Sequence, residues 1–309
     1  MNFDTLWKEY DANYSFFIVK NINWDSLRSV YRPQLTSRTN DLQLFQIISS
    51  MLANLKDGHV NLITPFAGYG YSGWWTPYPS NFLGVTAAMR YLAIDFGYST
   101  GNLIRSGETA DSIGYLYVGS FSGGSPNQWS SAIDAIMDSL KFARAVVVDL
   151  RNNGGGSDTY STIVASRFAD AQHTFSYVQW RNGPSHSDFT DYQPLTIGPS
   201  GPRRFTDRVA VLTNRRCFSS AEEAILMFKS FPYVTTVGDT SGGGAGNPVI
   251  LQLPNHWTYW VPRWIEYTAD LKIYEGIGLR PDIPVWISKA DSLAGRDAIL
   301  ERALQFLRR

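Results

Sequence analysis

From about residue 113 onward, apolar strands alternate with amphipathic helices, and this alternation constrains the fold more than any other feature of the sequence. Residues 144–151 contain an unbroken apolar run, Ala145 to Val148, as expected for a strand that is buried on both faces. Further strands are predicted at residues 113–121, 208–213 and 234–238, and helices at residues 129–142, 158–168 and 219–229. This order predicts a layered α/β core in which helices cover a sheet.

The sequence before and after these alternating strands and helices has a different pattern. Residues 1–56 have a helical pattern, and Phe45, Ile48, Leu52 and Leu55 share one face of a helix expected over residues 41–55. Towards the end of the chain we expect a hairpin over residues 248–261 and a helix over residues 294–307. We therefore divide the chain into three parts: an N-terminal helical subdomain (1–64), an aromatic loop with a connecting segment (65–112) and the core (113–309).

Composition and charge exclude several classes of function. The 27 Lys and Arg residues balance the 27 Asp and Glu residues, so we expect no nucleic-acid partner and no anionic membrane surface. The single cysteine, Cys217, excludes an intrachain disulfide and a Cys-rich metal site. No apolar stretch reaches the ~18 residues that a membrane span needs, and we expect a soluble mature domain.

A serine pair lies between the apolar strand at 208–213 and the helix at 219–229. A serine at the start of a helix lies beside free N–H groups, which favour developing negative charge, so this place suits a nucleophile. Ser219 and Ser220 also begin capping-box patterns that end at Glu222 and Glu223. Taken alone, the segment favours helix capping over catalysis.

Two glycine-rich segments follow predicted strands. Residues 149–156 place Gly154, Gly155 and Gly156 after the buried strand, where their N–H groups could form an anion nest or a tight turn. Their spacing matches neither a dinucleotide-binding fingerprint nor a phosphate-binding loop. Residues 238–246 are a second glycine-rich stretch, which could form a backbone-lined wall or a plain loop.

Only four histidines could act as a general base, and we expect His173, His186 and His256 to face solvent. His59 follows Asp57-Gly58 at the end of the first long predicted helix, where a structural role and a catalytic one are both open. No two histidines have metal-ligand spacing, so no metal or cofactor is implied.

Taken together, these segments resemble peptidase family S41, which comprises the C-terminal processing (tail-specific) proteases and their tricorn-core and interphotoreceptor-retinoid-binding-protein relatives. The resemblance rests on motifs in the family's order: residues 52–59, 113–121, 149–156, 218–223 and 275–282. It implies a ClpP/crotonase-like α/β core behind an N-terminal helical subdomain. It also implies a serine peptidase acting on a peptide or protein substrate.

Carried over position by position, the resemblance makes Ser219 the nucleophile, because that serine precedes Glu222 by three residues. It implies His59 as the base and Glu275 as the residue that orients it. The backbone N–H groups of Gly155 and Ser220 would form the oxyanion hole. Substrate contacts are expected from five further residues: Gly156, Gly243, Gly244, Trp74 and Trp75.

The chain departs from the family pattern in three places. Gly244 stands where the processing proteases have a lysine base, so we expect the Ser-His-Glu arrangement of the tricorn branch instead. Gly58 replaces the serine that precedes the histidine in tricorn. Only about fifty residues separate His59 from Ile113, too few for the PDZ domain that many members insert, so substrate capture could fall to the aromatic loop at 66–84. The alternative, which we favour, is that this loop is a surface flap packed on the core.

An alternative function is a non-catalytic module that binds apolar ligands or peptides on the same fold, with residues 66–84 lining the groove. The presence of Ser219, His59 and Glu275 together favours the enzyme. The resemblance to the family also favours an extracytoplasmic location, in the periplasm or cell envelope, with the signal segment absent from this chain. The oligomeric state is left open.

Overall fold

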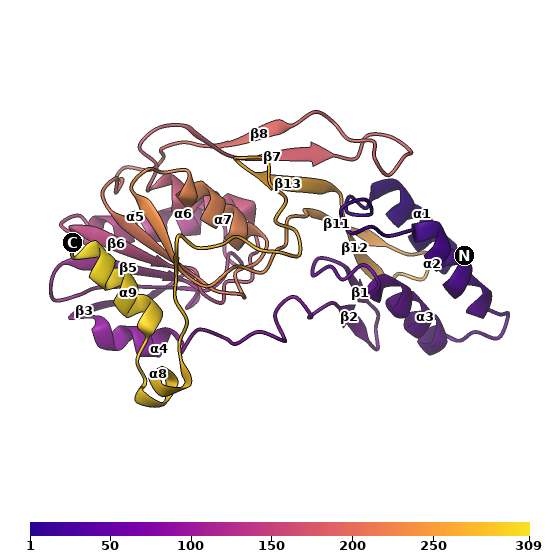
Figure 1. Ribbon diagram of the computed structural model, residues 1–309, viewed down its shortest axis with the longest axis horizontal. Helices are drawn as coiled ribbons and strands as arrows, with labels where there is room; N and C mark the ends of the chain where they lie inside the picture. Colours follow the sequence, from indigo (N-terminus) through magenta and orange to yellow (C-terminus); the bar gives the residue numbers. More distant parts are fainter.

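The parallel strands predicted from residue 113 onward form the centre of a seven-stranded sheet in the computed structural model, which describes residues 1–309 (Figure 1). The strand order is β14 (Ile283–Pro284), β10 (Val234–Gly238), β9 (Val209–Thr213), β6 (Ala145–Asp149), β5 (Ile113–Val118), β4 (Ile104–Glu108) and β3 (Ile94–Ser99). The strands from β14 to β5 pair in parallel, whereas β4 and β3 add an antiparallel edge.

Alternate residues of the central strands enter two different cores, because successive side chains of a strand point to opposite faces. On β6, Val146 and Val148 pack with the helices α5 (Pro126–Ser139) and α7 (Ser220–Lys229). Ala145 and Val147 pack on the other face against α9 (Ala298–Leu307). A third helix, α6 (Asp158–Ser166), packs against both α5 and α7. The layered α/β core predicted from the sequence is confirmed.

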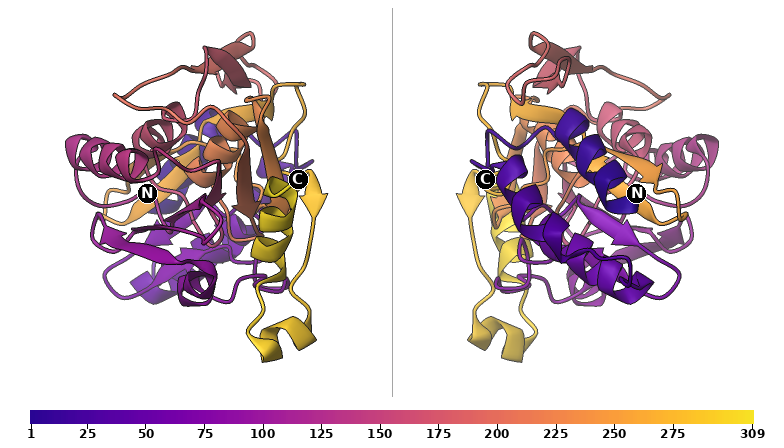
Figure 2. Two further views of the ribbon diagram at one scale, coloured as in Figure 1. Left: turned by 90° about the vertical axis from the view of Figure 1, so that its left-hand side faces the viewer. Right: turned by 90° about the vertical axis from the view of Figure 1, so that its right-hand side faces the viewer.

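A second, four-stranded sheet joins the two ends of the chain. The predicted hairpin is present as β11 (Pro248–Gln252) and β12 (Thr258–Pro262), and β12 pairs with β1 (Asn61–Ile63), which pairs with β2 (Gly68–Gly70). This sheet lies with three helices in a smaller lobe (Figures 1 and 2): α1 (Asn2–Asn13), α2 (Trp24–Tyr31) and α3 (Asp41–Ala53). Strand pairing therefore connects residues 1–64 with the part of the chain after residue 247.

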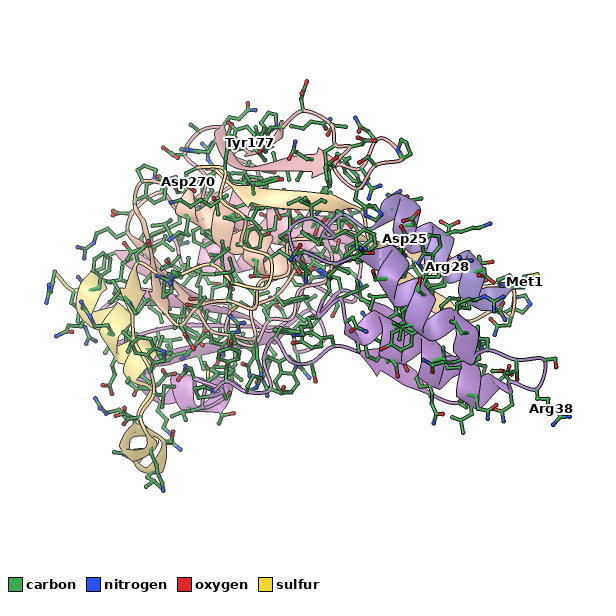
Figure 3. All side chains as sticks on the ribbon, turned by 45° about the vertical axis from the view of Figure 1, so that its right-hand side comes forward. Met1, Asp25, Arg28, Arg38, Tyr177 and Asp270 are labelled. Carbon is green, nitrogen blue, oxygen red and sulfur yellow. The ribbon has the colours of Figure 1, made fainter.

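A three-stranded antiparallel sheet runs along the upper side of the molecule in the view of Figure 1. It consists of β13 (Trp264–Thr268), β7 (His173–Trp180) and β8 (Gln193–Ile197). Figure 3 shows Tyr177 on β7 and Asp270 just after β13 at this edge. Because β13 follows β12 directly along the chain, it carries the backbone from the smaller lobe to the larger one.

Several elements differ from the sequence prediction. Residues before 113 supply β3 and β4, so the predicted boundary at residue 112 falls between two paired strands of one sheet. The last predicted helix is present as α9, but it begins at Ala298 instead of residue 294, because Asp297 caps it. A short helix that was not predicted, α8 (Lys289–Ala294), precedes it and ends at Gly295 in a left-handed conformation. A short helix, α4 (Val85–Ala88), and two 3₁₀ turns, η1 (Arg32–Gln34) and η2 (Met89–Tyr91), complete the chain. None of the helices has both the length and the apolar character required to cross a bilayer.

Candidate active site

Three loops that follow neighbouring parallel strands meet at one edge of the large sheet. The carboxyl ends of β6, β9 and β10 lie together there, which is where open α/β sheets place their ligand sites. Backbone hydrogen bonds join the loops: the Phe218 N–H donates to the Asn153 carbonyl (3.1 Å), and the Gly242 N–H donates to the Cys217 carbonyl (2.7 Å). The glycine-rich segments and the serine pair singled out in the sequence are thus brought into contact.

Ser219 occupies a strained turn at the beginning of α7. Its φ of 57° and ψ of −131° are rare for a residue with a side chain, and such strain concentrates at functional sites. Its side chain is half-buried, whereas Ser220 is only 2% exposed and the Ser220 hydroxyl has no hydrogen-bond partner. The N-cap position belongs to Ser219, so the capping box predicted from Ser220 is wrong.

Glu222 connects the serine to the second glycine-rich loop. One carboxylate oxygen accepts the N–H groups of Ser219 (3.1 Å) and Gly244 (2.7 Å). The other oxygen accepts the Gly243 N–H (2.7 Å) and the Ser241 hydroxyl (2.6 Å). Burial raises the pKa of this carboxyl, while its four donors oppose that rise. A residue that the sequence indicated only as a capping partner therefore sets the geometry of two loops.

The backbone around Ser219 offers free N–H groups. The Ser220 N–H has no acceptor within the chain, and neither has that of Gly156. The Gly155 N–H donates to the side-chain oxygen of Asn153 (2.9 Å). A Cβ on Gly155 would lie 2.6 Å from the Phe218 carbonyl oxygen, so only glycine can approach the nucleophile segment this closely.

His59 lies beside the nucleophile segment but is not hydrogen-bonded to it. Its imidazole ring packs on the ring of Phe218 at a centroid distance of 4.7 Å, and neither ring nitrogen has a hydrogen-bond partner. The backbone N–H of His59 donates to Asp57 (2.8 Å). Burial lowers the pKa of His59 to about 4, so the ring is neutral at physiological pH.

Glu275 lies in a buried ionic network with a residue that the sequence analysis missed. One of its carboxylate oxygens is 2.7 Å from Lys20 Nζ, and the other accepts the Ala245 N–H (2.9 Å). Lys20 Nζ is also 3.8 Å from a carboxylate oxygen of Asp57. No hydrogen bond joins Glu275 to His59. Lys20 belongs to no motif in the sequence, which is why nothing pointed to it.

The charges of this network oppose one another. Burial lowers the pKa of Lys20, but Asp57 and Glu275 outweigh it and leave that pKa raised. Burial and the charge of Asp57 raise the pKa of Glu275, against the pull of Lys20. Lys20 is therefore a cation at neutral pH and is not poised as a base.

The aromatic loop packs against the nucleophile segment. The Trp74 ring stacks on Phe218 at a centroid distance of 4.2 Å, and Arg215 donates to the Trp74 carbonyl (2.6 Å). The guanidinium of Arg216 lies over Trp75 at 4.1 Å. Phe218 is thus enclosed by Trp74 and His59. A Cβ on Gly58 would lie 2.7 Å from the Phe218 ring, so the packing explains why no larger residue precedes His59.

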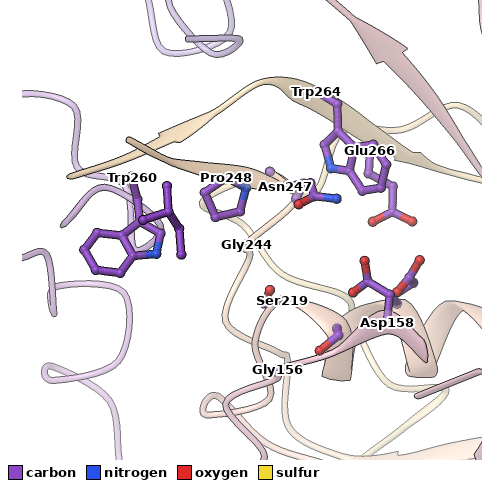
Figure 4. Close-up of a pocket in the computed structure, with 14 residues that line it drawn as sticks. Gly156, Asp158, Ser219, Gly244, Asn247, Pro248, Trp260, Trp264 and Glu266 are labelled. Atoms are coloured by element: carbon purple, nitrogen blue, oxygen red, sulfur yellow. The ribbon is translucent and has the colours of Figure 1, made fainter. Parts of the chain in front are cut away.

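A cavity of about 190 Å³ opens beside Ser219 (Figure 4). Its lining residues are Gly156, Asp158, Ser219, Ser220, Glu223, Gly244, Ala245, Gly246, Asn247, Pro248, Ile250, Trp260, Trp264 and Glu266. Of the predicted substrate contacts, Gly156 and Gly244 line this cavity, whereas Gly243, Trp74 and Trp75 do not. The sequence analysis missed Asp158 and Glu266 and gave Glu223 only a capping role.

Comparison with solved structures places this architecture among known peptidases. A proposed peptidase from Parabacteroides merdae matches with a TM-score of 0.88 and 35% identity, covering 100% of this chain and 96% of the other. Mature CPAF matches at a TM-score of 0.72 and 13% identity over 99% of this chain and 95% of that one. The photosystem II D1 C-terminal processing protease matches at 0.58 and 15% identity, covering 96% and 95%. The last two similarities concern the fold.

Sequence profiles agree with the structural similarity. The tricorn protease C1 domain matches residues 1–53. The profile of peptidase family S41 matches residues 112–285, which is more than half of the chain and contains the three converging loops. A comparison with curated protein sequences gives no significant match. With this profile match and a full-length relative at 35% identity, the chain belongs to peptidase family S41 and is a peptidase.

Proposed function

We propose that the protein hydrolyses peptide bonds by a serine mechanism in which Ser219 is the nucleophile, His59 the base and Glu275 the residue that orients His59. The observation that carries the proposal is the position of Ser219. It occupies a strained helix-start turn, borders the cavity and is followed by a free N–H group. A serine so placed meets a substrate carbonyl with a hydrogen-bond donor already beside it.

In the proposed mechanism the Ser219 hydroxyl oxygen attacks the carbonyl carbon, while His59 accepts the hydroxyl proton and later gives it to the leaving amine. Water then hydrolyses the acyl-enzyme by the same route. The neutral ring of His59 is in the protonation state that a base needs, and both its nitrogens are free to take up Ser219 and Glu275. Assembly of the triad requires the imidazole to turn from Phe218 towards these partners.

The oxyanion would be held by the Ser220 N–H together with a donor from the facing glycine loop. Gly155 fills that role if its N–H leaves Asn153 when substrate binds, and the neighbouring Gly156 N–H is free already. Lys20 would act at a distance from the chemistry: its ion pair with Glu275 supplies the countercharge to a buried carboxylate.

Labelling with a fluorophosphonate tests the nucleophile, because this probe forms a covalent bond only with an activated serine. We expect a single adduct, located by mass spectrometry on Ser219. Ser219→Ala should lose the adduct and lower turnover by about 10⁴-fold or more. Ser220→Ala is the matched control: it keeps the backbone N–H and should keep the labelling.

Two outcomes would contradict the proposal. An adduct on Ser220 would move the nucleophile by one residue. A folded protein that reacts at neither serine would favour a binding module on the same fold. His59→Ala should reduce labelling as strongly as it reduces turnover, and an active His59→Ala protein would show that another base serves Ser219.

A further inference from the structure

Three carboxylates gather at one end of the cavity beside Ser219, and each comes from a different element. Asp158 is the first residue of α6, Glu223 lies one turn along α7 from Ser219, and Glu266 lies on β13. Residues four apart on a helix share a face, so Glu223 and Ser219 both face the cavity. Figure 4 shows the carboxylates of Asp158 and Glu266 pointing towards one another to one side of Ser219.

The acidic group has no positive partner in the chain. Asp158, Glu223 and Glu266 form no salt bridge, and none of the fourteen lining residues is basic. One oxygen of Glu266 accepts the Tyr274 hydroxyl (2.6 Å), but its other oxygen is buried without a partner. By contrast, the buried carboxylates of Asp149 and Asp297 are paired by Arg151, and that of Glu222 accepts four hydrogen bonds.

Several buried polar atoms at this site lack hydrogen-bond partners, and one of them is the hydroxyl of Ser220, which is not part of the acidic group. Ser220 and Glu266 are 2% and 4% exposed, and Glu223 is 8% exposed. The Ser220 hydroxyl and one oxygen of each glutamate have no hydrogen-bond partner. An unsatisfied buried polar group costs about 1–3 kcal/mol, so three such atoms on one cavity point to a site for a group that donates hydrogen bonds.

The walls of the cavity suit an elongated group with a charged end. Trp264 and Glu266 are two residues apart on β13 and therefore share a face. Lysine and arginine bury their apolar stems along such surfaces while the charged head meets polar groups. A cavity of about 190 Å³ is smaller than the roughly 300–1,000 Å³ of sites for drug-sized ligands, and this size fits a single side chain.

We propose that this cavity is a specificity pocket for a lysine or arginine side chain that flanks the scissile bond of the substrate. The inference rests on the proposed function, since it takes Ser219 as the point of attack. No group of His, Cys, Asp or Glu in the structure has metal-binding spacing, so the geometry favours an organic cation over a metal ion. Burial and the charges of neighbouring carboxylates raise the pKa of Glu223 and of Glu266, and a bound cation would favour the ionised forms of both.

Binding to a Ser219→Ala protein tests the pocket independently of turnover. The probes are four peptides that differ at one central residue: lysine, arginine, glutamine or norleucine, the last matching the lysine stem without its charge. We expect the lysine and arginine peptides to bind on the order of 100-fold more tightly than the norleucine peptide. Equal affinities, or a preference for norleucine, would overturn the pocket.

Substitutions test whether the acidic residues of the cavity cause the preference for lysine and arginine peptides. Glu266→Gln in the Ser219→Ala background should reduce the preference about 10-fold, and Glu108→Gln on β4, outside the cavity, should leave it unchanged. If Glu266→Gln fails to fold, Asp158→Asn replaces it, because Asp158 is exposed at the helix start. A preference that survives both acidic-site substitutions would also overturn the pocket.

Wild-type enzyme separates this inference from the proposed function. Fluorophosphonate labelling of Ser219 without a preference for basic peptides would keep the serine mechanism and reject the pocket. A basic preference in binding without labelling would keep the pocket and reject the mechanism. Where both hold, mass spectrometry of the cleaved peptides should find the basic residue next to the new terminus.

Discussion

The substitution Glu222→Gln tests how much the hydrogen bonds of a buried carboxylate add to the stability of the protein. The next residue in the same helix, Glu223, is also buried and therefore serves as a control for the effect of burial alone. Glu222 accepts four hydrogen bonds, and two fall on each oxygen. A glutamine keeps one acceptor oxygen and replaces the other with an NH₂ group. Two buried donors then lose their acceptor, and at about 1–3 kcal/mol each the free energy of unfolding should fall by about 2–6 kcal/mol.

The control is Glu223→Gln, the same change at a buried carboxylate that accepts no hydrogen bond at one oxygen. That substitution removes an unpaired buried acid, so the free energy of unfolding should stay within about 0.5 kcal/mol of wild type or rise. Chemical denaturation of the three proteins at pH 7 measures both effects. If Glu222→Gln is as stable as Glu223→Gln, the four contacts do not hold the loops, and the reasoning fails.

Three further outcomes are expected. Because burial lowers the pKa of His59 to about 4, the acid limb of kcat/KM should fall near pH 4, and a limb near ~6.5 would show that the ring is solvated in the free enzyme. Trp74→Ala should lower stability by about 2–3 kcal/mol through the lost stack on Phe218, whereas Trp75→Ala, which removes a guanidinium contact, should cost about 1 kcal/mol or less; equal melting temperatures for the two variants would contradict this. Burial raises the pKa of Glu266 from 4.5 to about 7, so its contribution to stability is present below about pH 4.5 and is lost as the pH rises to 7. The free energy of unfolding of Glu266→Gln, measured by chemical denaturation, should therefore change less between these pH values than that of wild type, by on the order of 3 kcal/mol.

The sequence was a good guide where local pattern determines structure. The four residues from Ala145 to Val148 could only be a strand buried on both faces, and the strand predicted at residues 234–238 has those bounds in the structure. Strand β3, at the edge of the large sheet, and strand β7, in the centre of the three-stranded sheet, were missed. Both strands mix polar and apolar residues without a clear alternation, and they form because of the strands they pair with. Local sequence propensity does not indicate such pairing.

The site shows the same division. The place of Ser219 at the start of a helix could be predicted because a helix start has a local signature. Lys20 and Glu266 could not, because each acquires its role from a partner in another element: Glu275 for the first and the acidic group of the cavity for the second. The order of motifs locates the loops, whereas charge pairing across the fold emerges only in three dimensions.

The pairing of β1 with β12 has a consequence for how the protein is made. Leu62 lies opposite Tyr259, so the sheet of the smaller lobe needs a strand synthesised nearly two hundred residues later. At 5–20 residues per second a ribosome takes about 10–40 s to cover that distance, and throughout that time β1 can pair with β2 but lacks β12 along its other edge. The nascent N-terminal segment is therefore exposed to chaperones and proteases until almost the whole chain has emerged, and closure of its sheet is among the last steps of folding.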